Sequence, residues 1–261
     1  EDDDEFHDQV FRGVNFTVQR PFNRFHRLEA FVQVLGVSEE VYRESFSTGY
    51  SSLSRDDGFH VYAAPGLALV RDNTIYGPTG PMGGGRSRLS VESGLGDLSF
   101  RSYLADIRRY VNVRQNYALA GRLIAATGEG RDPQYYRIGG PATVRGYPYG
   151  EFRGTSIVVT NLEFRFPLID HLRLGFPLPV SLGGVRGAFF FDAAAAWERG
   201  QGFRAFRTDG GWRLDDIHAS YGLSAGLNVG FTVLKWDLAW RTDLRRTFGS
   251  PRGYFSFGLD Y

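Results

Sequence analysis

The chain has 261 residues, a formal net charge of +1 and no cysteine. A charge this close to zero argues against a nucleic-acid partner held by bulk electrostatics. The missing cysteines exclude disulfides, a thiolate nucleophile and a cysteine-based metal site. The five histidines are scattered without metal-ligand spacing, so neither a metal nor another cofactor is expected. No run of about 18 apolar residues is present, which excludes a transmembrane helix.

The chain begins with the acidic segment EDDDEFH, and we expect residues 1–7 to be a disordered remnant. Residues 8–261 are expected to form one β-rich domain. Twelve segments have the composition and flanking turn residues of strands: 8–20, 24–36, 41–50, 59–72, 85–95, 98–111, 116–127, 155–167, 184–198, 217–230, 232–244 and 253–261. The segment 41–50 is included because single-chain bacterial barrels use even strand numbers. With twelve strands, both termini would lie on the periplasmic side.

The second half of the chain alternates strictly between apolar and polar residues. Tyr221 and Leu223 lie on the face opposite Ser220, and Trp236 lies opposite Lys235. A soluble sandwich would also alternate, but it would turn its charges to water and bury medium-sized aliphatic residues. Here one face is large, aromatic and continuous, while the other mixes glycine and serine with charges of both signs. This pattern predicts an all-β, antiparallel transmembrane barrel with an apolar exterior and a polar lumen.

One stretch, RIGGPATVRGYPYGEF (137–152), interrupts the strands. Its four glycines and two prolines predict a loop, which we place at about residues 129–154. Arg145 lies near its centre. Gly146 would let the backbone approach a wall closely, and Tyr147 and Tyr149 would supply packing surface.

Two acidic residues on the following strands are candidate partners for this arginine. Alternation turns Glu163 inward, and Asp192 within AFFFDAAAAW would be costly on a lipid-facing surface. We therefore expect the loop to enter the lumen and Arg145 to pair with Asp192 and Glu163. The alternative is a surface loop with a solvated arginine.

The chain ends on an aromatic residue at a predicted lipid-facing position. Phe257, Leu259 and Tyr261 follow one another at two-residue steps. This ending matches the C-terminal strand of outer-membrane barrels and places Tyr261 in the periplasmic aromatic girdle.

Four landmarks in order resemble the bacterial surface antigen, or BamA/TamA-like, superfamily of outer-membrane assembly and translocation barrels. They are LALVRDNTIYGPTGPMGGGR (67–86), VRGYPYGEFRG (144–154), NLEFRFPL (161–168) and AFFFDAAAAW (188–197). Val144, Arg145, Gly146 and Tyr147 form the most specific part. The resemblance implies that this loop folds back into the barrel and that its arginine meets acidic residues on the lumen wall.

The resemblance also implies a function and a location. The protein would lie in the bacterial outer membrane among lipopolysaccharide and phospholipid. There it would assist the insertion or translocation of unfolded outer-membrane protein clients. A weak seam between segments 8–20 and 253–261 would open to receive them. Two departures from the family are noted: about twelve strands where sixteen are usual, without upstream POTRA domains, and Ala194 where glycine is expected.

Three other functions are considered. The barrel could anchor or translocate a fused N-terminal module without inserting clients. A passive pore is disfavoured, because the loop should obstruct a small lumen. An outer-membrane phospholipase would need a base beside its nucleophile, as His218 and Ser220 could supply. This pair faces the lumen, whereas the lipid substrate lies outside, so no enzyme activity is expected.

Overall fold

The structure is a computed structural model that describes residues 4–45, 50–77, 80–169, 172–175, 180–182, 184–207, 213–228 and 233–258. All regular elements in these residues are β-strands. No helix among them is long and apolar enough to cross a membrane.

Eleven strands form one path in which each strand pairs antiparallel with the next along the chain. They are β1 (Asp4–Pro21), β2 (His26–Ser45), β3 (Tyr50–Asp72), β5 (Gly80–Gly96), β6 (Phe100–Arg114), β7 (Tyr117–Gly130), β10 (Ser156–Ile169), β13 (Val185–Trp197), β16 (His218–Asn228), β17 (Val233–Thr242) and β18 (Thr247–Gly258). A twelfth strand, β4 (Ile75–Gly77), pairs with β5 outside this path. Three small two-stranded sheets complete the described residues: β8 (Tyr136–Ile138) with β9 (Phe152–Gly154), β11 (Leu172–Leu174) with β12 (Val180–Leu182), and β14 (Phe206–Arg207) with β15 (Arg213–Leu214).

The prediction of a separate strand at residues 41–50 is wrong. Residues 41–45 continue β2, and β3 begins at Tyr50. Gly36 and Ser38 resemble a turn in the sequence, but the ladder with β1 runs through them without interruption. A register shift against β3 between Ser38 and Glu40 absorbs the irregularity, as β-bulges do. Because eleven is an odd number, the start of β1 and the end of β18 lie at opposite ends of the strands, not at the same end as predicted.

The predicted boundary between residues 7 and 8 also falls inside a strand. Residues 1–3 lie outside the described residues, but Asp4 to His7 already belong to β1, where Asp4 pairs with Glu44 and His7 with Val41. The pairing partner lies in the part of β2 that had been predicted as a separate strand. The strand structure of Asp4 to His7 therefore depends on a pairing that local sequence does not reveal.

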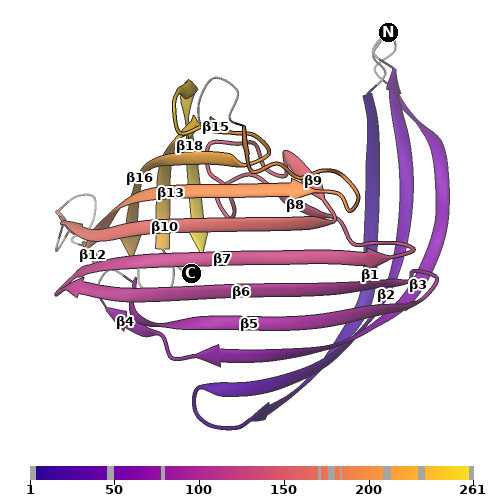
Figure 1. The fold of residues 1–261 in the computed structure, drawn as a ribbon, viewed down its shortest axis with the longest axis horizontal. Helices are drawn as coiled ribbons and strands as arrows, with labels where there is room; N and C mark the ends of the chain where they lie inside the picture. Colours follow the sequence, from indigo (N-terminus) through magenta and orange to yellow (C-terminus); the bar gives the residue numbers. More distant parts are fainter. Residues whose placement is uncertain are drawn as a thin grey trace.

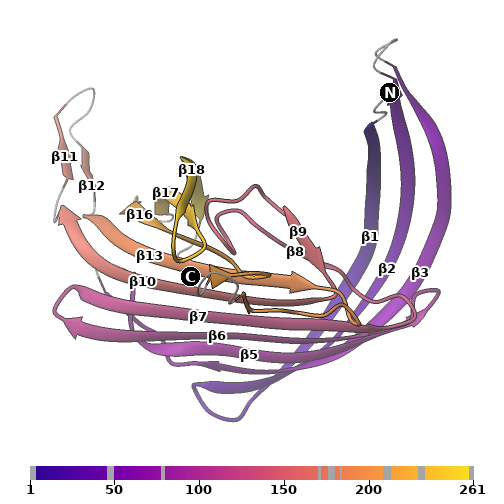
Figure 2. The same ribbon diagram turned by 45° about the horizontal axis from the view of Figure 1, so that its top comes forward.

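The sheet curls, so that one face is concave and the other convex (Figures 1 and 2). The concave face is called the inner face here and the convex face the outer face. The outer face carries exposed apolar side chains from every part of the path, among them Phe16, Leu69, Leu119, Leu162, Phe189, Leu223, Trp236 and Phe255. The predicted alternation is confirmed by the register, in which Tyr221 lies opposite Trp240 and Leu223 opposite Leu238.

The described sheet is open. β1 and β18 are the two ends of the path, and within the described ranges they are not paired with each other. Figure 1 shows β1, β2 and β3 standing upright beside the curled remainder of the sheet. The antiparallel all-β architecture is as predicted, whereas a closed barrel is not seen.

The connection between β7 and β10 lies over the inner face (Figure 2). β8 and β9 pair and close the loop at its base. The loop and the wall share one buried apolar cluster, made of Ala126, Ile138, Val144, Tyr147, Ile157, Val159 and Ala194. Ala194, which replaces an expected glycine, is therefore packed in the same cluster as the loop motif.

Candidate functional site

Arg145 is the centre of the site, and its side chain is only 1% exposed. Nε and Nη2 donate to the two oxygens of Asp192, each at 2.7 Å, which is a bidentate guanidinium–carboxylate pair. Nη1 donates to Oε1 of Glu163 at 2.8 Å. The backbone N–H of Arg145 adds a bond of 3.1 Å to Asp192. The structure thus brings together the arginine and both of its predicted partners.

The two carboxylates are positioned by neighbouring strands. Asp192 lies in the middle of β13, opposite Asn161 of β10. Asn161 donates from Nδ2 to Asp192 at 2.8 Å and to the Thr143 carbonyl at 2.6 Å, which ties the wall to the loop. Glu163 follows two residues later on the same face and also accepts from Arg165 at 2.9 Å. Alternation along two paired strands therefore presents both acids to one point of the loop.

Two further contacts of Arg145 were not predicted from the sequence. The guanidinium carbon lies 3.5 Å from the centroid of the Phe190 ring, within range of a cation–π interaction. Nη1 also lies 3.4 Å from Oδ1 of Asp237 on β17, which in turn lies 3.6 Å from Nζ of Lys235. Alternation places Phe190 and Asp237 on the inner face. Phe190 lies two residues before Asp192 on β13, whereas Asp237 is brought to the loop from β17 by the curl of the sheet.

Gly146 occupies a position that only glycine suits. Its φ is +93°, and an added Cβ would lie 3.2 Å from Cγ of Arg241 and 3.4 Å from Cβ of Ser220. Its N–H donates to the hydroxyl of Tyr254 at 2.9 Å, and that hydroxyl donates to the Tyr147 carbonyl at 2.7 Å. Tyr254 lies on β18, so the loop is bonded to the last strand of the path.

The two tyrosines of the loop have different surroundings. Tyr147 is 8% exposed and its hydroxyl donates to the Ala219 carbonyl at 3.3 Å. Tyr149 is 84% exposed, so the prediction that it supplies packing is wrong. The positive φ of Gly150, +67°, turns the chain sharply beside Tyr149. Val144 is fully buried in the apolar cluster of the loop.

His218 and Ser220 do not form a hydrogen-bonded pair. The His218 ring stacks on Phe152 with 3.6 Å between centroids and an angle of 6°. The Ser220 hydroxyl is buried and has no hydrogen-bond partner among the described residues. Both residues serve the packing between loop and wall in this structure.

The base of the loop is fixed by an acidic residue outside the sheet. Oδ2 of Asp132 accepts from the Ser99 N–H at 2.9 Å and from Nε of Arg131 at 3.0 Å. The backbone hydrogen bond from Ser99 is the largest influence that lowers the pKa of the Asp132 carboxyl. The ionised form therefore joins the loop to the β5–β6 turn.

The structure describes only one of the three residues predicted to form the C-terminal barrel signal. Phe257 is 76% exposed and pairs with Leu234 on the outer face. Leu259 and Tyr261 lie outside the described residues. Within the ranges that the structure describes, no group of three or more His, Asp or Glu side chains could hold a metal ion.

Comparison with protein families matches residues 2–261 to the Omp85 superfamily domain. The chain belongs to the Omp85 superfamily. A search of curated proteins finds no significant match. Among solved structures, the chain is similar to that described as "The crystal structure of BamA from Haemophilus ducreyi lacking POTRA domains 1-3", with a TM-score of 0.65 and 15% sequence identity.

The alignment with the BamA structure covers 96% of this chain and 54% of that one. The Omp85 chain therefore spans about half the length of that structure, and at this identity the likeness concerns the fold alone. The family indicates a bacterial outer-membrane protein, and the fold is similar to that of BamA.

Proposed function

We propose that this Omp85 chain is the membrane-embedded part of a factor that helps other proteins insert into, or cross, the outer membrane. In this proposal the sheet closes into a barrel in the complete protein, and the loop around Arg145 is a plug in its lumen. Family membership over nearly the whole chain is the observation that carries the proposal.

The free strand edges support a seam at which clients could pair. β1 is 18 residues long, and one of its edges has no partner in the described sheet. An unpaired edge of this length can template an incoming strand by β-augmentation. β18 is an irregular edge, because it contains Pro251 and its register against β17 shifts between Ala239 and Arg241.

The loop is hydrogen-bonded to one strand of this seam. Tyr254 of β18 bonds to both Gly146 and Tyr147, next to the buried arginine. We propose that the Arg145 cluster holds the loop rigidly, and that the loop then holds β18 in place from inside. The seam would open and close against a fixed wall.

The orientation proposed for the sheet follows from the lengths of its connections. Outer-membrane barrels have short periplasmic turns and longer surface loops. Residues 131–155, between β7 and β10, and residues 198–217, between β13 and β16, are the longest connections, and both leave the same end of the strands. We place this end, called the loop end, at the cell surface, and the end of β18 at the periplasm.

The test is made in cells that carry the full-length gene intact, deleted, or with Arg145→Ala. The matched control is Arg88→Ala, which removes an inner-face arginine whose carboxylate partner is Glu29 on β2. Assembly of other outer-membrane proteins is measured as the fraction that resists unfolding in detergent without heating. Impaired client assembly on deletion and in Arg145→Ala, with normal assembly in the control, supports the proposal. Unaffected clients, together with the mislocalisation of a fused N-terminal module, would identify a membrane anchor instead.

A further inference from the structure

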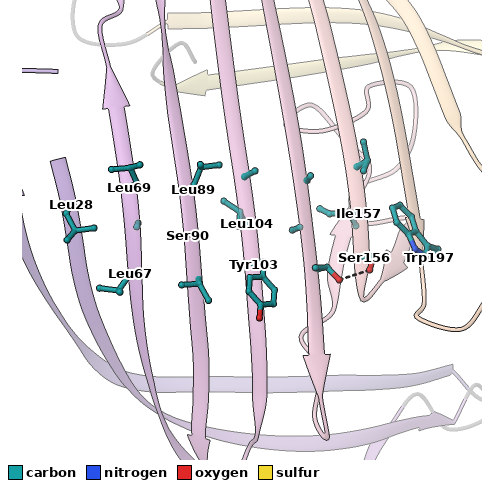
Figure 3. Close-up of a pocket in the computed structure, with 17 residues that line it drawn as sticks. Leu28, Leu67, Leu69, Leu89, Ser90, Tyr103, Leu104, Ser156, Ile157 and Trp197 are labelled. Atoms are coloured by element: carbon teal, nitrogen blue, oxygen red, sulfur yellow. Dashed lines mark hydrogen bonds between the residues drawn. The ribbon is translucent and has the colours of Figure 1, made fainter. Parts of the chain in front are cut away.

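The outer face carries an apolar trough that the loop and the seam do not involve. It is a hollow of about 740 Å³ that crosses the strands from β2 to β13 (Figure 3). This volume lies within the range of about 300–1,000 Å³ that is usual for sites of small ligands. All residues that line it belong to the described part of the chain.

The register of the sheet explains the shape of the trough. One wall is a row of directly opposed residues on successive strands: Leu28, Leu69, Leu89, Ala105, Ala125 and Val158. The other wall is the neighbouring row, two residues nearer to the loop end of the strands. It is made of Leu67, Val91, Tyr103, Thr127, Ser156 and Trp197. Two such rows stand about 7 Å apart, which suits one extended hydrocarbon chain.

The trough is widest in the middle of the first row, because the side chains there are small. Ala105 and Ala125 replace the leucines that stand on β2, β3 and β5. Tyr103 and Trp197 keep the second wall high on the other side (Figure 3). A groove with one low and one high wall remains open to the surrounding lipid along its length.

The trough is polar at one end and purely aliphatic at the other. At the loop end of the strands, the hydroxyls of Thr127 and Ser156 lie 2.9 Å apart and bond to each other. Trp197 is the last residue of β13 at that end. At the other end the outward-facing side chains of the lining are aliphatic, with Leu28 near the start of β2, and Ser90 is a polar residue of the lining between them. An amphiphile would therefore lie with its head at the loop end.

Exposed cationic groups lie beyond the polar end. Arg199, with a side chain that is 75% exposed, donates to Glu129 at 2.8 Å. Arg101 is exposed and lies directly opposite Glu129 in the ladder between β6 and β7. Tyr103 reaches the same carboxylate with its hydroxyl, at 3.5 Å. Two guanidinium groups at the head end suit a phosphorylated headgroup.

The trough is long enough to span the hydrocarbon part of one leaflet. Six strand spacings of about 4.8 Å make roughly 29 Å, and strands tilted by about 45° would lower this to a depth of roughly 20 Å. The hydrocarbon part of one leaflet is about 15 Å thick. A chain that enters at the loop end would thus reach the middle of the membrane.

We infer that the trough is a binding site for an acyl chain of lipopolysaccharide, whose phosphates meet Arg101 and Arg199. The choice of lipopolysaccharide rests on the proposed function, which places the loop end at the cell surface, where this lipid forms the outer leaflet. A phospholipid offers the same chemistry of acyl chain and phosphate, and the experiment distinguishes the two.

The test compares full-length protein purified from outer membranes in mild detergent. Rough lipopolysaccharide or phosphatidylethanolamine is added, and the retained lipid is counted by native mass spectrometry. Ala105→Leu with Ala125→Leu fills the trough, and Ala125→Leu alone is a milder variant. Ala225→Leu, also on the outer face but between Gly187 and Trp236, is the matched control. Resistance to detergent without heating reports whether each variant is folded.

We expect the wild type and the control to retain lipopolysaccharide. The filled variant should retain at least about fivefold less of this lipid, since the added leucine side chains occupy the space of the acyl chain. Equal retention by folded filled variants would overturn the site. Preferential retention of phosphatidylethanolamine would overturn the choice of lipid and the surface placement. Because no client is present, loss of lipid retention and loss of client assembly are measured separately, so either proposal can fail alone.

Discussion

Two parts of the inner face carry the same kind of ion cluster in different surroundings. On β2 and β5, Glu29 accepts from Arg27 at 2.7 Å and from Arg88. The Glu29 side chain is 6% exposed, but the two arginine side chains are 33% and 38% exposed, so water reaches this cluster from the arginine side. On β10 and β13, Glu163 and Asp192 accept from an arginine that is 1% exposed. The loop between β7 and β10 covers the second cluster, and β1–β3 remain bare (Figure 2).

Burial, more than pairing, decides how much each ion cluster contributes to the free energy of unfolding. A solvent-exposed pair contributes about 0–1 kcal/mol, because water screens it and both side chains lose freedom. Removing one partner of a buried pair costs about 3–5 kcal/mol, because the remaining charge has lost both water and partner. By burying the ion pairs of Arg145, the loop makes these pairs strong enough to hold the loop itself in one position.

The largest expected effect comes from removing the cation of each cluster. Arg145→Ala removes the bidentate partner of the buried Asp192, while Glu163 keeps Arg165, and it should lower the free energy of unfolding by about 3–5 kcal/mol. Arg88→Ala leaves Glu29 beside Arg27 and should cost about 1 kcal/mol or less. Urea unfolding of the protein in lipid vesicles, followed by tryptophan fluorescence, measures both. Equal losses would show that the loop does not create the difference.

A smaller effect is expected at the glycine beside the arginine. Gly146→Ala adds a Cβ against Arg241 at a positive φ and should cost about 1–3 kcal/mol. Gly202→Ala is the control, because an added Cβ there meets nothing within 4 Å. The same unfolding measurement applies, together with protease cleavage of the loop. A neutral Gly146→Ala would mean that the loop can dock in another way.

The bond between the loop and the last strand should matter less. Tyr254→Phe removes a hydroxyl that serves both Gly146 and Tyr147, and we expect a cost of about 1–2 kcal/mol. Hydrogen exchange should become faster in β18 and stay unchanged in β5. In the control Tyr103→Phe, the lost hydroxyl bonds to Glu129 in an exposed position between β6 and β7, away from β18. If β18 exchanges at the same rate in both variants, the loop does not hold the last strand.

The smallest effect concerns the pH dependence of the loop base. The pKa of Asp132 is lowered in the folded protein, so its contribution is present above the usual carboxylate pKa and is lost as the pH falls through the lowered value. The amide of Ser99, which bonds to Asp132, should lose protection from hydrogen exchange in that acidic range, after correction for intrinsic exchange. Asp132→Asn should abolish this acid-dependent step. Persistence of the step in Asp132→Asn would assign it to another group.

Some of the site could be predicted because strand alternation is local. A period of two along β10 and β13 is enough to turn Glu163 and Asp192 inward, and an aspartate amid phenylalanine and alanine has nowhere else to point. The remaining contacts depend on distance in space. Phe190 shares a face of β13 with Asp192, but Asp237 and Tyr254 carry no signal that links them to the loop, because the loop bonds to them across 92 and 108 residues of chain.

The local pattern of residues was enough to predict which side chains face inward, where the long loop lies and which cation it carries, since these follow from neighbours along the chain. Residues 41–45 continue β2, and Asp4 is already in a strand, because these two segments pair with each other across the ladder, which is a tertiary contact. The tertiary structure also decided that Tyr149 is exposed and that two cross-strand rows leave a trough on the outer face. Curl and register are properties of the whole sheet, and no single strand encodes them.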